Sequence, residues 1–108
     1  MPKDWAIMRH FLLLFKGKVT MLLKVFGIYD SKAEAYLQPF FMKSKGEAIR
    51  ALTALVNDKD HNFGKYSEDF TLFELGSWND ANATFEMLHT PHSMGVLMEF
   101  KKELVTNA

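Results

Sequence analysis

The sequence contains no cysteine, which excludes a disulfide framework, a thiolate zinc site and a cysteine nucleophile. It has only three prolines and six glycines among 108 residues, and 48% of the residues are hydrophobic, so the composition is neither collagen-like nor disordered. Thirteen basic residues balance thirteen acidic ones, which argues against a protein that condenses DNA by charge alone. We expect a chain of this length to form a single globular domain over residues 21–108.

Long hydrophobic runs are also absent near the N-terminus, where the apolar run at residues 11–15 is shorter than the roughly 7–15 residues of a secretory signal. It is far shorter than the ~20 residues that span a bilayer, so we expect no membrane association. Two interpretations of residues 1–20 stay open. They are an N-terminal extension upstream of a natural start at Met21, or they form an amphipathic helix with one apolar face. That face would carry Trp5, Met8, Leu12 and Phe15.

Three segments rich in β-branched and aromatic residues predict strands, at residues 22–29, 69–78 and 83–88. Asparagine and aspartate at residues 79–82 predict a turn that makes the last two strands antiparallel. Pro39 lacks a backbone donor, so residues 38–42 are at best an edge strand or an extended loop. Residues 32–37 are ambiguous between one helical turn and an irregular crossing.

The clearest predicted element is a helix over residues 45–57. Ser44 and Glu47 have the spacing of a capping box, which satisfies two free amides at a helix start. An apolar stripe with helical period follows, and Asn57 and Asp58 end it. The stripe consists of Ala48, Ile49, Leu52, Leu55 and Val56.

After Pro91, Ser93 can cap a short C-terminal helix, although residues 95–100 (GVLMEF) also suit a strand. The predicted fold is therefore α+β: a small antiparallel or mixed sheet of three to four strands, packed against one main helix, with a short C-terminal helix. An unpaired edge strand in such a sheet makes a homodimer plausible.

Catalytic and metal-binding patterns are weak. His89 and His92 are three residues apart, but Pro91 between them breaks the helix that would align both imidazoles on a metal. The sequence has no glycine-rich phosphate loop and no nucleophile elbow. We therefore expect neither an enzyme nor a bound metal or other cofactor.

A basic and aromatic stretch at residues 32–50 is the best candidate for a binding site. Rings that stack on bases, interleaved with cations that follow phosphates, are typical of single-stranded nucleic-acid binding. Adjacent side chains on an extended segment point to opposite sides, so of Phe40 and Phe41 one can be core and the other exposed. The alternative that both rings belong to the core stays open. The candidate nucleic-acid-binding residues are Lys32, Tyr36, Phe40, Phe41, Lys43, Lys45 and Arg50.

Three segments, KVFGIYDSKAEAYLQPFF, GEAIRALTALVND and EDFTLFELGSWND, resemble the small nonstructural protein of gokushovirus-type microviruses, which are circular single-stranded DNA phages. The matching blocks lie at residues 28–35, 39–41, 48–50 and 69–76. The resemblance implies a phage protein of the host bacterial cytoplasm that is absent from the virion. It implies a role in replication or packaging of the single-stranded DNA genome, with single-stranded DNA or the phage replication complex as partner. The alternative is an adaptor that recruits a phage or host replication factor without binding nucleic acid.

Overall fold

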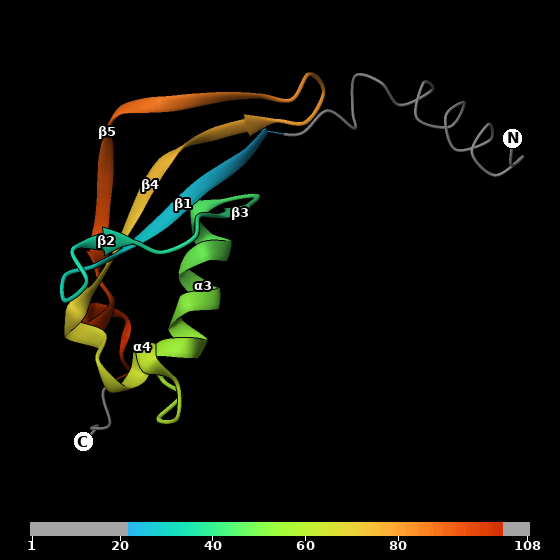
Figure 1. Ribbon diagram of the computed structural model, residues 1–108. Coiled ribbons are helices and arrows are strands. Elements are labelled where there is room, and N and C mark those ends of the chain that lie inside the picture. Colours follow the sequence, from blue (N-terminus) through green and yellow to red (C-terminus); the bar gives the residue numbers. More distant parts are fainter. Residues whose placement is uncertain (1–21, 103–108) are drawn as a thin grey trace, which may run out of the picture.

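The computed structural model describes residues 22–102, which form an α+β domain (Figure 1). The sheet has five strands, and one main helix packs against it. The strands are β1 (Leu22–Asp30), β2 (Ala35–Tyr36), β3 (Phe40–Met42), β4 (Phe70–Asn79) and β5 (Thr84–Val96). The helices are α3 (Lys45–Val56), the short α4 (Asn62–Lys65) and the 3-10 turns η1 (Ser67–Asp69) and η2 (Leu97–Phe100). The predicted α+β class is confirmed.

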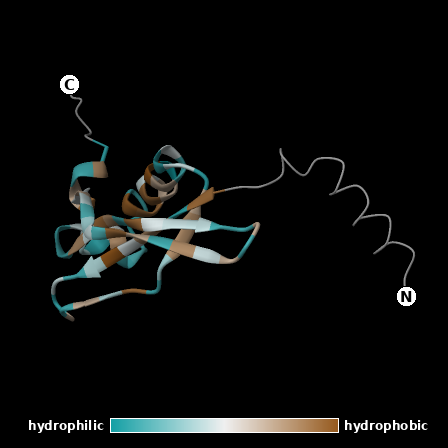
Figure 2. Ribbon diagram, turned by 90° about the horizontal axis from the view of Figure 1, so that it is seen from above, coloured by the Kyte–Doolittle hydropathy of each residue, from teal (hydrophilic) through white to brown (hydrophobic). Residues whose placement is uncertain are grey.

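Strand β1 organises the sheet, whose order is β2-β1-β4-β5 with β3 also paired to β1. All the pairs are antiparallel. Because β4 occupies one edge of β1 along its whole length, β2 and β3 share the other edge, one at each end. Figure 2 shows brown segments on parts of the strands and of the main helix. Strand β1 therefore pairs directly with every other strand of the sheet except β5.

Strand β2 lies in the segment that the sequence left ambiguous. The side chain of Asp30 accepts hydrogen bonds from the backbone N–H groups of Lys32 and Ala33, at 3.0 and 3.3 Å. This local turn, which Glu34 completes with a positive φ of 56°, reverses the chain so that Tyr36 faces Tyr29. Side-chain bonding at a turn, rather than strand propensity, thus produces this two-residue strand.

Helix α3 begins as predicted and ends one residue earlier. The hydroxyl of Ser44 accepts a hydrogen bond from the Glu47 backbone N–H at 3.2 Å, and the Glu47 carboxylate accepts one from the Lys43 N–H at 3.1 Å. The helix ends at Val56, and the Asn57 side chain caps it by donating to the Thr53 carbonyl at 2.7 Å. Local capping interactions therefore define both ends of the helix.

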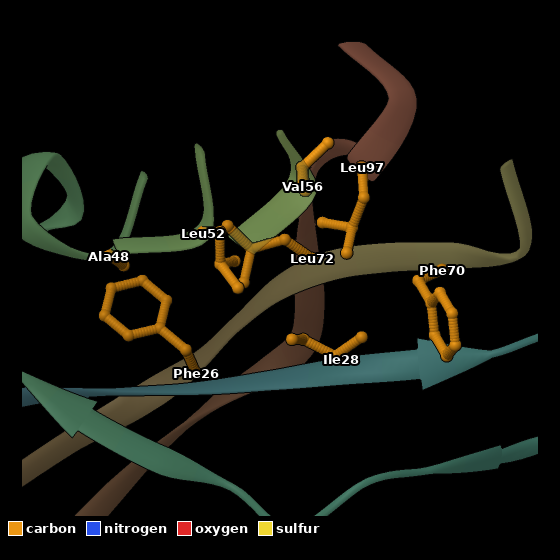
Figure 3. Packing of buried hydrophobic residues seen from close by; sticks show 8 residues of the cluster. All are labelled: Phe26, Ile28, Ala48, Leu52, Val56, Phe70, Leu72 and Leu97. Carbon is orange, nitrogen blue, oxygen red and sulfur yellow. The ribbon is translucent and has the colours of Figure 1, made fainter. Parts of the chain in front are cut away.

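The hydrophobic core lies between α3 and one face of the sheet (Figure 3). Full burial of one valine, leucine, isoleucine or phenylalanine side chain stabilises the fold by about 1.5–3 kcal/mol before entropy is subtracted. The core consists of Phe26, Ile28, Ala48, Leu52, Val56, Phe70, Leu72 and Leu97.

The end of the chain differs from the prediction. The expected strand at residues 83–88 continues to Val96, and only η2 is helical, so Ser93 lies in a strand and caps no helix. The register steps from Met87 opposite Gly76 to His92 opposite Glu74, which leaves residues 88–91 without a partner on β4. Pro91 therefore interrupts no ladder bond there, and β5 turns sharply (Figure 1).

Both interpretations of residues 1–20, as an extension or as an amphipathic helix, concern positions outside the described residues. Within residues 22–102, no helix is long and apolar enough to cross a membrane.

Replacing Leu72 with alanine tests the core. Leu72 is fully buried at the centre of the cluster, so Leu72→Ala removes packing and leaves a cavity. We expect it to lower the free energy of unfolding by about 2–5 kcal/mol, measured by urea denaturation. Leu22→Ala makes the same change at an exposed position of β1 and should cost far less. Equal losses from the two variants would contradict the placement of the core.

A candidate nucleic-acid interface

The sheet face opposite α3, here called the ring face, carries most of the aromatic side chains of the strands. Because Phe26 and Ile28 of β1 point to the helix, alternation turns Val25, Gly27 and Tyr29 to the opposite side. Register then places further residues there. Phe41 faces Val25, Phe73 faces Gly27, Trp78 faces Leu23 and Phe85 faces Trp78.

One group of rings, the Tyr36 cluster, consists of Tyr29, Tyr36 and Phe73. The ring centroids of Tyr29 and Tyr36 are 5.1 Å apart, those of Tyr36 and Phe73 are 5.6 Å apart, and both pairs are edge-to-face. Gly27 lies beneath them, since a Cβ atom at that position would come within 2.8 Å of the Leu75 side chain and 3.3 Å of the Tyr36 ring. A glycine at residue 27 therefore lets these side chains close over β1.

The second group, the Trp78 cluster, consists of Phe41, Trp78 and Phe85. The Trp78 and Phe85 centroids are 4.7 Å apart, and Phe41 lies 6.3 Å from Trp78 and 6.1 Å from Phe85. With Leu23, these rings line a shallow apolar depression. Phe41 is 41% exposed and Phe85 54% exposed, so this cluster presents aromatic surface that nothing in the described chain covers.

The predicted aromatic residues divide between the two faces. Tyr36 and Phe41 lie on the ring face, one in each cluster. Phe40 lies on the other side, where it stacks on Phe26 at 5.6 Å and packs against the core. The expected split between the adjacent phenylalanines is confirmed, and Phe40 is removed from the candidate site because strand alternation turns it toward α3.

The predicted cations do not gather in one patch. Lys45 lies 3.4 Å from the Glu74 carboxylate, which also pairs with Lys24 at 3.5 Å. Glu74 is only 8% exposed and faces α3, so it neutralises Lys45 on the side away from the rings. Arg50 is exposed on α3, also away from the rings.

Two of the predicted cations remain near the ring-bearing strands. Lys32 is exposed in the turn before β2, and Lys43 is exposed directly after β3. Lys32 lies beside Asp30, Glu68 and Asp69 at one end of the sheet, and Lys43 lies where the chain passes from β3 into α3. The strand residues placed on the ring face by the registers above are all uncharged.

Sequence reasoning missed four rings of this face: Tyr29, Phe73, Trp78 and Phe85. For the three rings on β1 and β4, the signal was that apolar residues occupy both alternating phases of the strand and not only the phase that faces the core. The residue pattern of these two strands therefore marks both of their faces as apolar.

The described residues contain no group of three or more histidine, aspartate or glutamate side chains placed to hold a metal ion. Both His89 and His92 are exposed on β5.

The described residues thus form a small α+β domain in which α3 covers one face of the sheet and the opposite face carries aromatic side chains. The chain belongs to the Phage ORF5 protein family, whose model matches residues 23–100, nearly the whole of the described domain. No curated protein and no solved structure matches the chain.

The bridge between Glu74 and its two lysines gives a salt-dependent prediction. Glu74→Gln removes the charge that holds Lys24 and Lys45, and we expect the free energy of unfolding to fall by about 1 kcal/mol or less at low salt. The loss should shrink near ~1 M salt, where the Debye length is about 3 Å. Urea denaturation at both salt concentrations measures it. Glu86→Gln, at an exposed carboxylate of β5, is the control. A loss of unfolding free energy in Glu74→Gln that does not change with salt would count against the ion pairs.

Proposed function

We propose that this phage protein is a nonstructural accessory protein that acts in replication or packaging of a single-stranded DNA genome. It works by binding and has no catalytic role, in the host bacterial cytoplasm and outside the virion. Family membership supports the phage origin. The narrower assignment rests on the blocks at residues 28–35, 39–41, 48–50 and 69–76, which resemble the small nonstructural protein of gokushovirus-type microviruses.

Within this role, the ring face contacts single-stranded DNA. The observation that carries the proposal is the exposure of Phe41 and Phe85 beside Trp78 on the open side of the sheet. Every nucleobase has a π face, so exposed rings bind single strands with little sequence preference. Aromatic residues on an open sheet are a recurrent platform for unstacked bases.

Phosphate contacts are fewer in this arrangement than the sequence suggested. Lys32 lies beside three carboxylates, Lys43 lies between β3 and α3, and Lys45 is held by Glu74. Each phosphate contact on a single strand contributes about −0.7 to the slope of log affinity against log salt. The proposal therefore implies weak, stacking-dominated binding with a shallow salt dependence.

Removing one exposed ring tests this directly. We expect Phe85→Ala to weaken binding of a fluorescein-labelled oligothymidine by about 5- to 150-fold, because stacking on one ring contributes about 1–3 kcal/mol. Fluorescence anisotropy at ~50 mM salt measures the dissociation constant. Tyr66→Ala removes a ring that is 51% exposed but lies outside the sheet, and should leave binding unchanged.

The same titration at ~200 mM salt separates stacking from charge. Lys43→Ala should reduce the salt slope by about 0.7 and leave most of the affinity at high salt. No binding by the native chain at either salt concentration would discard direct DNA contact. Equal effects of Phe85→Ala and Tyr66→Ala would place the contact elsewhere.

A second function is favoured by the absence of charge among the strand residues of the ring face. An uncharged, partly exposed aromatic surface also suits the centre of a protein–protein interface, where aromatic residues are enriched and charged ones depleted. The chain would then be an adaptor that recruits a phage or host replication factor. Affinity capture from infected cells with and without nuclease distinguishes the two, because a partner that survives nuclease treatment supports the adaptor.

A further inference from the structure

The first half of β5 is a sheet edge with unusual features. Residues 84–93 are all exposed, and β5 has β4 as its neighbour on one side only. Beyond Met87, residues 88–91 also lack a partner on β4. The outer edge of residues 84–90 therefore offers backbone N–H and C=O groups to another strand, up to Pro91, which has no N–H.

Apart from the register shift beyond Met87, this edge has few of the features that normally block pairing. Natural sheets protect their edges with lysine, proline, bulges or a covering segment. Residues 84–90 contain no lysine and no proline, and they expose Phe85, Met87 and Leu88. The stretch is bounded on one side by the turn that ends at Ala83 and on the other by Pro91, which cannot extend a ladder.

We propose that residues 84–90 pair in antiparallel fashion with the same residues of a second copy of this chain, around a twofold axis at Met87. A twofold interface is self-complementary, so the pairing segment must be centred on its own axis. Met87 is the midpoint of the stretch bounded by Ala83 and Pro91. This pairing makes one continuous sheet from the two copies, with both ring faces on the same side.

The choice of axis follows from the side chains. The side chains of facing residues in an antiparallel pair lie on the same side of the sheet. A twofold axis perpendicular to the sheet must therefore pass between the two copies of one residue, which face each other. An axis at Glu86 would place two carboxylates directly opposite each other, which is unfavourable. An axis at Met87 places Met87 opposite Met87 and Phe85 opposite His89, and this brings apolar and aromatic surface together.

The proposed dimer does not depend on DNA binding, although it would extend the surface that DNA can contact. With the ring faces on the same side, Phe85 of each copy lies in the new strand pair, and Trp78 of each copy lies on the strand behind it. One DNA strand could then contact both copies. Because self-association is measured without DNA, its failure and the failure of DNA binding are separate results.

The first measurement is the mass of the full chain in solution, by light scattering after size-exclusion chromatography over a range of micromolar concentrations. We expect the mass of two chains. Met87→Glu and Met87→Lys each place like charges at the axis and should each give the mass of one chain. An equimolar mixture of these two variants should recover the mass of two chains, because only the mixed pair brings opposite charges together.

Matched controls keep this test independent of folding. Met87 is 56% exposed and Met98, on η2, is 53% exposed, so Met98→Glu makes the same change at an equally exposed methionine away from β5. It should stay dimeric. A native chain that is monomeric at every concentration overturns the proposal. Dimeric single variants, or a mixture that stays monomeric, overturn the placement of Met87 at the axis.

A crosslink tests the register directly. Because the chain has no cysteine, Met87→Cys can form a disulfide only with the same residue of another copy. Facing Cα atoms in an antiparallel pair are about 4.5–5.5 Å apart, within the range that a disulfide bridges. Mild oxidation should convert Met87→Cys, and not Met98→Cys, into a covalent dimer on a non-reducing gel. Equal crosslinking of the two variants would contradict the pairing.

Discussion

The fold depends on the two-sided character of β1. Its even-numbered residues Phe26 and Ile28 pack beneath α3, and its odd-numbered residues Val25, Gly27 and Tyr29 form the floor of the ring face. The same strand pairs with β2, β3 and β4. A change of one residue in its register would exchange the core face and the ring face, so every other strand position follows from this alternation.

The two faces of the sheet differ in whether the described chain covers them. The helix side buries its apolar residues against α3 and neutralises Glu74 with Lys24 and Lys45. The ring side has apolar and aromatic residues in the same alternating phase, yet Phe41 and Phe85 remain substantially exposed. Contiguous exposed apolar surface often marks an interaction site, which is why the proposed binding function is placed on this side.

Local signals predicted much of the structure. Ser44, Glu47 and Asn57 marked the ends of α3 because capping is a short-range interaction that sequence spacing records. The strand beginning at Leu22 and the turn after Asn79 were equally local. The course of β5 beyond residue 88 was not predictable in this way, since Pro91 is tolerated only because of how β4 and β5 are registered. Of the predicted site residues, Tyr36 and Phe41 lie on the ring face, whereas Lys45 and Arg50 were grouped with them by a sequence proximity that the fold does not preserve.

The central claim is that the exposed rings, and not the helix, receive the nucleic acid. Two-dimensional amide NMR of the full chain during titration with oligothymidine tests it most directly. The account predicts that shifts concentrate on β3, the second half of β4 and the first half of β5, with α3 unchanged. Shifts concentrated on α3 around Lys45 and Arg50, or no shifts at saturating oligonucleotide, would contradict it.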